Sequence, residues 1–289
     1  MDTCNFIKDL LLWIDNNLEN DLSIDAISHR SGYSKWHLQR MFRAVTGRKI
    51  GTYVRERRLT RAAFSMRMTK ISIVDIAVLY NFESQQSFTR AFKKLFGKAP
   101  GYYRRTNDWS MKELCPPFNI ERKEIPSPAI IYMPDMDLSD VTHSYFFRPD
   151  HFTEESIGHH ADYLYNYLKR HNITEGKLYG MRKFQHEAFN SYSIAQVKAE
   201  HTNNKTDCDY FKFNGGAFIK FNFHGKLADF QKFVAFIYNT CLPLLGVVRR
   251  DDCDIEIFHI SGRNLNLSED IFCDYLIPVN AQKTAFKNQ

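Results

Sequence analysis

Four side chains around residue 40 carry the hydrogen-bonding groups that can read the edges of nucleic-acid bases. Trp36, Gln39, Arg40 and Arg43 recur at i, i+3, i+4 and i+7, so they share one face of a helix. A guanidinium donates two hydrogen bonds to guanine, and a carboxamide pairs similarly with adenine. Arg40 and Gln39 therefore suit base reading in a major groove, and Trp36 can contact a thymine methyl, a base or a phosphate. A partly buried packing role is the alternative for Trp36.

The same pattern returns about fifty residues later, where Arg40 and Gly47 recur as Arg90 and Gly97. The outward-facing residues of this second segment are its candidates for base reading. They are Gln85, Gln86, Thr89 and Arg90. Gln and Thr also serve as phosphate contacts, which position a protein without reading sequence. Base reading is therefore expected of the first segment more than of the second.

Basic side chains beside both segments are candidates for contacts to phosphate oxygens. They are Arg43, Lys49, Arg55, Lys93 and Lys94, and a solvated surface is the alternative role for each. Residues 1–107 hold 19 Lys and Arg against 9 Asp and Glu, whereas the rest of the chain is net acidic. A charge asymmetry of this size is the electrostatic footprint of a phosphate-binding half.

The first set of side chains is predicted to lie on a helix-turn-helix motif at 23–46. Ser34 is a favourable N-cap for a helix that begins at Lys35. Gly47 can close this helix because glycine takes a positive φ without strain. The buried stripe of the helix is predicted to consist of Leu38, Met41, Phe42 and Val45.

The second set is predicted to lie on another helix-turn-helix motif, at 72–96. Ser84 is its cap, and Asn81 occupies the turn position that glycine has in the first motif. Asn is the non-glycine residue that best tolerates a left-handed conformation, so the turn survives the change. Residues 50–68 contain no Gly or Pro other than Gly51, and they suit a long helix that fixes the spacing of the two motifs.

Beyond residue 107 the pattern changes. Pro116 and Pro117 prevent a continuing helix, so 108–118 is predicted to be a linker between a domain at 1–107 and one at 119–289. Aromatic and β-branched runs predict strands at 129–132, 191–197, 217–223, 255–260 and 276–279, and apolar periodicity predicts helices at 156–171 and 227–245. Strands and helices recur in two comparable halves, which indicates an α+β domain of duplicated origin.

Several runs of residues are shared with a known family. In the first half they are Trp-His-Leu-Gln-Arg-Met-Phe at 36–42, the Gln85-Gln86 pair, and the closing segment 92–104. They resemble the AraC/XylS family of transcription regulators, and within it the MarA/SoxS/Rob group. The long extension after residue 107 is similar to that of the Rob type. Its matching stretches are 215–216, 240–243, 249–250, 254–256 and 276–278.

The resemblance implies an all-α N-terminal domain with two helix-turn-helix motifs joined by a long helix, and an α+β C-terminal domain of duplicated gyrase-inhibitor-like (GyrI-like) type. It also implies that positions 36, 39 and 40 face the major groove. The expected function is a sequence-specific regulator, an activator of stress, multidrug-efflux and resistance genes, with promoter DNA and RNA polymerase as partners. Two reading helices on one chain predict a monomer that binds an asymmetric site.

The C-terminal domain is rich in aromatic residues, which suits a pocket for apolar molecules. By resemblance to multidrug-sensing domains, which use a pocket carboxylate for cationic ligands, Glu256 is a candidate ligand contact, together with Tyr163 and Phe221. The expected effector is a small amphipathic molecule such as a bile salt, a fatty acid or a cationic drug. The alternatives are a plain aromatic core, and a salt bridge from Glu256 to Arg249 or Arg250.

Other classes of function find little support. The first residues lack the basic region of a secretory signal, and the most apolar stretch, 233–248, falls short of the roughly 20 residues needed to span a bilayer, so a cytoplasmic, nucleoid-associated protein without a membrane contact is expected. The six cysteines form no Cys-x-x-Cys pair, so neither a metal nor a cofactor is expected.

Two alternatives to a ligand-responsive regulator stay open. One is an abundant DNA-binding protein whose C-terminal domain only stabilises it or mediates an interaction. The other is a C-terminal domain that hydrolyses small molecules. This alternative is less favoured because the sequence contains no nucleophile and base with recognisable spacing. The chain is therefore not expected to be an enzyme.

Overall fold

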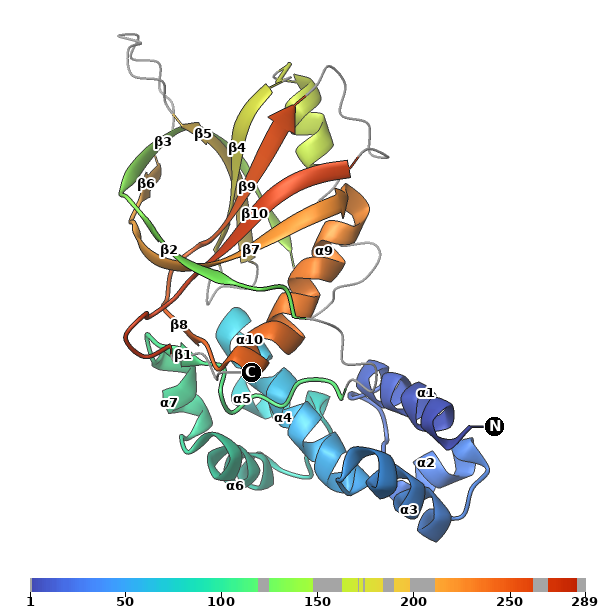
Figure 1. Cartoon of the computed structure of the whole chain (residues 1–289). Helices are drawn as coiled ribbons and strands as arrows, with labels where there is room; N and C mark the ends of the chain where they lie inside the picture. Colours follow the sequence, from blue (N-terminus) through green and yellow to red (C-terminus); the bar gives the residue numbers. More distant parts are fainter. Residues whose placement is uncertain are drawn as a thin grey trace, which may run out of the picture. The chain divides into compact units, whose positions relative to one another are not determined.

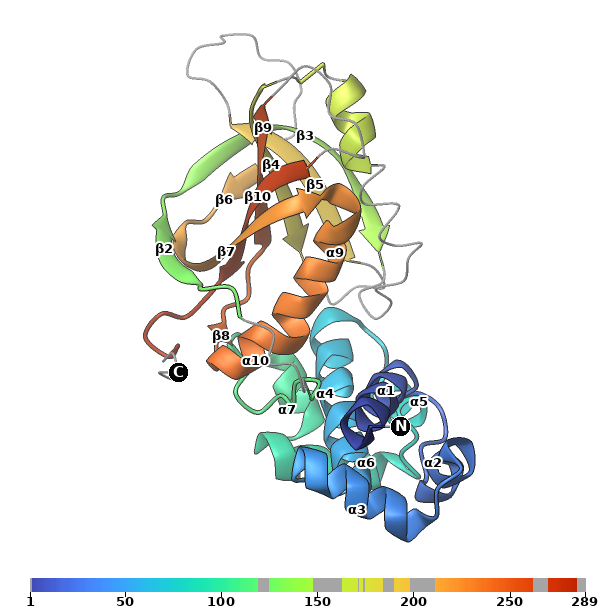
Figure 2. The same ribbon diagram turned by 45° about the vertical axis from the view of Figure 1, so that its right-hand side comes forward.

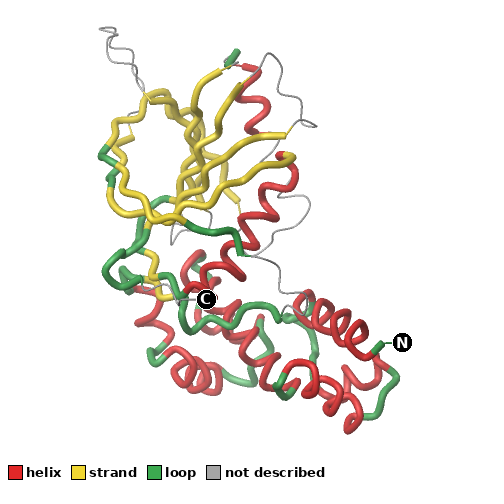
Figure 3. Tube along the Cα trace, viewed as in Figure 1, coloured by secondary structure: helices red, strands yellow, loops and turns green. Residues whose placement is uncertain are grey.

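The computed structural model describes residues 2–118, 125–147, 163–170, 172–173, 175–183, 190–197, 211–261 and 270–284. The chain forms two compact units. The first comprises Met1–Thr106 with Glu113–Ile125, and the second comprises Asn107–Lys112 with Pro126–Gln289. The first unit is helical, and the second consists of antiparallel strands with helices, as the colours of Figure 3 make clear.

The first part of the helical unit contains α1 (Thr3–Asn16), α2 (Ile24–Ser31) and α3 (Lys35–Thr46). The Ser34 hydroxyl accepts a hydrogen bond from the backbone N–H of His37, and Gly47 ends α3 at a φ of +71°. Leu38 and Phe42 of α3 are buried in a core that α1 and α2 share. The predicted first helix-turn-helix motif is therefore confirmed as α2 and α3.

The second part contains α4 (Ile50–Met68), α5 (Ile73–Leu79), α6 (Gln85–Phe96) and α7 (Pro100–Arg105). In α6, Ser84 and Ser87 form a reciprocal capping box, which fixes where the helix starts. Asn81 has a φ of +55° in the turn between α5 and α6, the left-handed conformation that the sequence predicts. The second helix-turn-helix motif and the long joining helix α4 are confirmed.

The second unit contains an eight-stranded antiparallel sheet in the order β2-β7-β10-β9-β4-β5-β3-β6. Its strands are β2 (Ala129–Met133), β3 (Met136–Phe147), β4 (Glu175–Lys183), β5 (Asn190–Val197), β6 (Phe211–Phe213), β7 (Gly216–Lys226), β9 (Asp254–Ser261) and β10 (Asp270–Pro278). If β2, β3, β4 and β5 exchange places with β6, β7, β9 and β10 respectively, the result is the same strand order written backwards. The sheet therefore has the two-fold internal symmetry that a duplicated α+β domain predicts.

The two ends of the strand order meet at one corner, so the sheet closes on itself and is seen as a ring in Figure 1. Only two residues separate β2 from β3 and β6 from β7, and these two long bent segments pair on both sides of the corner. A Cβ on Gly215 would lie 2.3 Å from the Met133 carbonyl oxygen, so the corner requires glycine. The Gly215 N–H also donates to Asp135 Oδ1 at 2.7 Å.

Helices cover one face of this sheet, where α9 (Leu227–Phe236) continues through a π-helical turn at Ile237–Cys241 into α10 (Leu242–Leu245). Figure 2 shows α9 lying along β7, and the rings of Phe223 and Phe230 are 5.2 Å apart. The helix predicted at 227–245 is confirmed. Of the helix predicted at 156–171, residues 163–170 are helical, and 156–162 and 171 lie outside the described residues.

Strands are present at the five predicted positions, although β10 begins at Asp270, before the predicted start at 276. The sequence pattern did not predict β3, β4, β6 or the short strands at Trp109–Ser110 and Val248–Arg249. β4 has glycine at 176 and 180 and a buried Arg182, and β3 carries Asp, Ser, Thr and His among its apolar residues, so neither shows a clean period of two. Pairing with neighbours on both sides stabilises these strands despite their composition.

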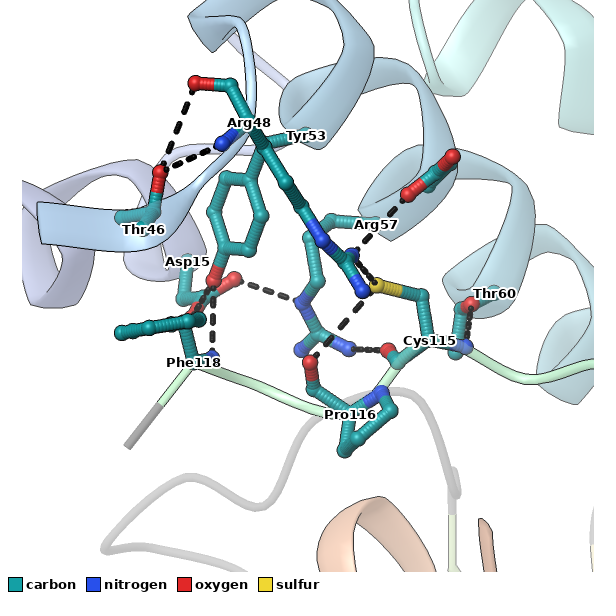
Figure 4. Close-up of polar contacts among 10 residues, drawn as sticks. Asp15, Thr46, Arg48, Tyr53, Arg57, Thr60, Cys115, Pro116 and Phe118 are labelled. Carbon is teal, nitrogen blue, oxygen red and sulfur yellow. Dashed lines mark hydrogen bonds and ion pairs between the residues drawn. The ribbon is translucent and has the colours of Figure 1, made fainter. Parts of the chain in front are cut away.

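The segment expected to be a linker, 108–118, is divided between the units. Trp109–Ser110 forms β1, which pairs with β8 (Val248–Arg249) in the second unit. Residues 113–118, which we call the strap, bind the helical unit (Figure 4). Within the strap, the Cys115 N–H donates to Thr60 Oγ1 at 2.9 Å, and the Phe118 N–H donates to the Tyr53 hydroxyl at 3.2 Å.

Two arginines complete the contact between the strap and the helices. Arg57, only 1% exposed, donates to the Cys115 carbonyl oxygen and pairs with Asp15 at 2.7 Å. Arg48 donates to Cys115 Sγ at 3.1 Å and pairs with Glu56 at the same distance. Burial raises the pKa of the Cys115 thiol, against the opposing charge of both arginines. The strap therefore satisfies the buried polar side chains of Tyr53, Arg57 and Thr60 in α4.

We expect Thr60→Val to destabilise the helical unit. Valine has nearly the same shape but cannot accept from the Cys115 N–H, and an unsatisfied buried donor costs about 1–3 kcal/mol. Differential scanning calorimetry of the full chain should show a lower melting temperature for the helical unit. Thr52→Val, at an exposed position of the same helix, is the control and should change little. Equal melting of both variants would contradict a stabilising strap.

Candidate DNA-binding surface

The outer face of α3 carries the first set of predicted reading residues. Trp36, Gln39, Arg40 and Arg43 are all exposed, and the Trp36 side chain is 69% exposed. The Arg40 guanidinium lies over the Trp36 indole ring, 4.8 Å from its centroid. A cation on an aromatic face in this way loses part of its rotamer freedom before any ligand binds. The two side chains therefore form a partly preorganised pair on the surface.

α3 is held in place by contacts around its first turn. Tyr33, just before the helix, packs edge-on against Phe6 of α1 and lies 5.3 Å from the His37 ring. At the same turn Lys35 pairs with Asp25 of α2. These contacts, with the buried stripe beneath, fix the rotation of the helix and so determine which side chains point outward.

α6 carries the second set. Gln85, Gln86 and Arg90 are exposed, whereas Thr89 is half-buried. The buried face of α6 consists of Phe88, Phe92 and Phe96, with Tyr103 of α7 packed against the last two. Thr89 is accordingly less accessible than the other three predicted readers. α3 and α6 each pack against α4, which runs between them (Figure 1).

The five predicted phosphate contacts, Arg43, Lys49, Arg55, Lys93 and Lys94, are all exposed. Arg43 lies in the last turn of α3, and Lys93 and Lys94 in the last turn of α6. Lys49 is the N-cap residue of α4. Their positions beside the reading residues leave them accessible to a duplex backbone.

Several other basic residues of this unit bind the protein's own backbone. Arg58, Arg67 and Arg104 donate to carbonyl oxygens of Asn20, Thr106 and Ile71 respectively, and Arg57 donates to that of Cys115. Part of the positive charge that predicts phosphate binding is therefore structural. A count of charges cannot separate the two uses, because backbone acceptors leave no mark in the sequence.

In the second unit the predicted ligand residue Glu256 is fully buried. Its Oε1 accepts from Arg182 at 2.9 Å, and Arg182 also donates to Gln231 of α9 at 3.2 Å. The predicted alternative partners, Arg249 and Arg250, are wrong, since they pair with Asp254 and Asp252. The partner of Glu256 is Arg182 of β4, a strand that the sequence pattern does not predict.

The other two predicted ligand residues differ in their surroundings. Phe221 is buried in the row Phe221–Tyr275–Glu256–Gly180, whose members pair across β7, β10, β9 and β4. Tyr163 lies in the helical segment 163–170 and is half-buried, and this burial raises the pKa of its phenol. The sequence pattern did not predict Arg182 or Gln231 as neighbours of Glu256.

The Gln231 amide is notable because it is buried next to this ion pair. Its Oε1 accepts from Arg182, but its Nε2 has no hydrogen-bond partner within the described part of the chain. A buried donor without a partner costs free energy, and a bound water or ion is one explanation for such a group. Among the described residues, His, Cys, Asp and Glu form no group that could hold a metal ion. No described helix is long and apolar enough to cross a membrane.

Comparison with known proteins matches both units. Residues 18–106 match a model of a helix-turn-helix domain, and residues 128–280 match a GyrI-like small molecule binding domain. Transcriptional regulator Rob of Salmonella typhimurium strain LT2 is 34% identical, over 96% of this chain and 99% of that protein. Right origin-binding protein of Escherichia coli K12 has the same identity and coverage.

A further relative of similar length is the F1 operon positive regulatory protein of Yersinia pestis. It is 30% identical, over 98% of this chain and 91% of that protein. The two exposed, capped helices α3 and α6, the closed α+β unit and these full-length matches all point to one family. The chain belongs to the AraC/XylS family of DNA-binding transcription regulators, in the group that joins an AraC-type helix-turn-helix domain to a GyrI-like domain.

Proposed function

We propose that this regulator binds asymmetric promoter sites as a monomer and activates stress, multidrug-efflux and resistance genes. The observation that supports this proposal best is the pair of capped, exposed helices α3 and α6, both packed against α4. Two such helices on one chain can enter adjacent major grooves about 34 Å apart, as a dimer does for simpler repressors. Because the two helices carry different side chains, the site they read is not a palindrome.

The two helices have unequal roles. On α3, Arg40 reads guanine and Gln39 reads adenine, and Trp36 both contacts the duplex and holds Arg40 in place. On α6, Gln85, Gln86 and Arg90 reach base edges, while the half-buried Thr89 contributes less. Arg43, Lys49, Arg55, Lys93 and Lys94 bind phosphates and set the register of the complex.

Activation requires a second partner, RNA polymerase, recruited from the bound promoter. A full-length relative, the Yersinia pestis protein, is by name a positive regulatory protein, which supports activation over repression. The protein would then act where the chromosome lies, in the cytoplasm at the nucleoid.

The GyrI-like unit serves as a sensor of a small amphipathic effector, such as a bile salt, a fatty acid or a cationic drug. The ligand would contact Phe221 and Tyr163, and would offer an acceptor to the Nε2 of Gln231, which has no partner among the described residues. A cationic ligand would compete with Arg182 for Glu256, and an anionic one would compete with Glu256 for Arg182. Either exchange replaces one buried pair by another.

A second function is favoured by one observation. Glu256 already has a full charge partner in Arg182 and no exposure to solvent. That arrangement also fits a GyrI-like unit that only stabilises a DNA-binding protein or mediates an interaction. Ligand binding separates the two possibilities.

We expect Arg40→Ala to remove most of the preference for specific DNA. A bidentate contact to a base contributes about 1–3 kcal/mol of discrimination, whereas non-specific binding depends on phosphates. The dissociation constant should rise roughly 5- to 150-fold on a duplex selected by the wild-type chain, and little on random duplex. Fluorescence anisotropy at fixed salt measures both.

Lys93→Ala is the matched contrast, because an exposed lysine bound to a phosphate carries no sequence information. It should weaken binding to both duplexes alike and reduce the slope of log affinity against log salt by about 1. If Arg40→Ala instead lowered affinity equally on both duplexes, its role as a base reader would be wrong.

For the sensor role, we expect a cationic dye, a bile salt or a fatty acid to raise the melting temperature of the GyrI-like unit. A ligand at a hundred times its dissociation constant stabilises by about 2.7 kcal/mol. Glu256→Gln should abolish the shift caused by a cationic ligand, whereas Asp229→Asn, at an exposed position of α9, should preserve it. No shift with any ligand class in the wild-type chain would support the stabilising role instead.

A further inference from the structure

Residues 18–20, between α1 and α2, bind side chains from two other parts of the helical unit. Arg58 of α4 donates from Nε to the Leu18 carbonyl oxygen at 2.9 Å and from its terminal nitrogen to that of Asn20 at 2.6 Å. Asn81 donates from Nδ2 to the carbonyl oxygens of Glu19, at 2.5 Å, and Asn20, at 3.2 Å. All the acceptors are backbone atoms of one short loop.

The loop precedes α2 and packs on the core of the first helix-turn-helix motif. Leu18 within it and Leu22 after it are buried in the same core as Leu38 of α3. Its backbone is further fixed by Asn20, whose N–H and side-chain amide both donate to Asn17, at 2.9 and 3.0 Å. The carbonyl groups that Arg58 and Asn81 contact therefore move with α3.

Asn81 belongs to the second motif. It lies in the turn between α5 and α6, where its N–H donates to the Val78 carbonyl oxygen at 2.9 Å and its φ is +55°. Its side chain thus extends from the turn that orients one recognition helix to the loop packed beneath the other. The corresponding turn of the first motif has Gly32, which offers no side chain for such a contact.

We propose that Asn81 and Arg58 are positioning residues that fix the separation and relative rotation of α3 and α6. We call their four hydrogen bonds to residues 18–20 the inter-head clamp. The clamp adds a second connection between the motifs, besides the covalent one through α4. This inference rests on the proposed reading of one duplex by both helices.

The clamp is expected to act on spacing, not on either recognition surface. When two linked modules bind one target, the effective concentration of the second is greatest if its held position matches the site. A stiffer connection raises affinity for correctly spaced halves and lowers it for misspaced ones. Loosening the connection therefore lowers the affinity for a correctly spaced site but not for a misspaced one. Affinity for a single half-site stays unchanged.

Three duplexes test the clamp with the full-length chain. The first is selected by the wild-type chain from a random pool, the second has one half of that site scrambled, and the third has one base pair inserted between the halves. The insertion moves one half by about 3.4 Å along the duplex. The readout is the spacing ratio, which is the dissociation constant for the third duplex divided by that for the first.

Two variants remove the clamp and one serves as the control. Asn81→Gly keeps the positive φ of the turn but removes the amide. Arg58→Met keeps an unbranched apolar stem but removes the donors. Glu19→Ala is the control, because the clamp uses only the backbone carbonyl group of that residue. Melting temperatures of all variants show whether the fold is kept.

We expect Asn81→Gly and Arg58→Met to lower the spacing ratio by about threefold or more, with affinity for the scrambled duplex unchanged relative to the control. A ratio that stays at the wild-type value would overturn the clamp, whether affinity is unaltered or falls equally on all duplexes. If the wild-type chain keeps its affinity when either half of the site is scrambled, the proposal that α3 and α6 read one duplex together is wrong. The clamp would then have no role in DNA binding.

Discussion

The distance between two recognition helices is the constraint on which the rest of the helical unit depends. A single chain reads two grooves only if both helices hold a fixed position relative to one another, since each degree of freedom lowers the effective concentration of the second helix. α4 supplies the covalent connection, and two of its arginines, Arg58 and Arg67, bind backbone carbonyl groups of neighbouring segments. Part of the basic charge thus maintains geometry, while the exposed basic side chains stay accessible.

In the second unit, contacts between segments distant in sequence likewise fix the geometry of the sheet. At the Gly215 corner β2 pairs with β7 and β6 pairs with β3, so the two ends of the strand order meet there, and α9 covers one face of the barrel-like sheet. Within that covered face, Glu256 and Asp254 are held by Arg182 and Arg249. Buried pairs of this kind cost several kcal/mol to break, so in the proposed sensor role a ligand would have to supply equivalent contacts. This requirement favours ligands that carry both a charge and apolar surface.

Local signals predicted the helical unit well, because caps and apolar spacing act within one helix. Ser34, Ser84, Gly47 and Asn81 each have the role that their residue type indicates. Contacts between distant segments could not be predicted in this way. The partner of Glu256 comes from β4, whose glycines obscure the strand pattern, and the strap binds Arg57 through a backbone carbonyl group that any residue would provide.

The central claim is that one chain reads two adjacent major grooves. Hydroxyl-radical footprinting of a complex with one chain per selected duplex tests it most directly. The structure predicts two protected patches on one face of the duplex, about one helical turn apart, with unequal base contacts in the two. A single protected patch, or two symmetric patches that appear only when a second chain is bound, would contradict the account.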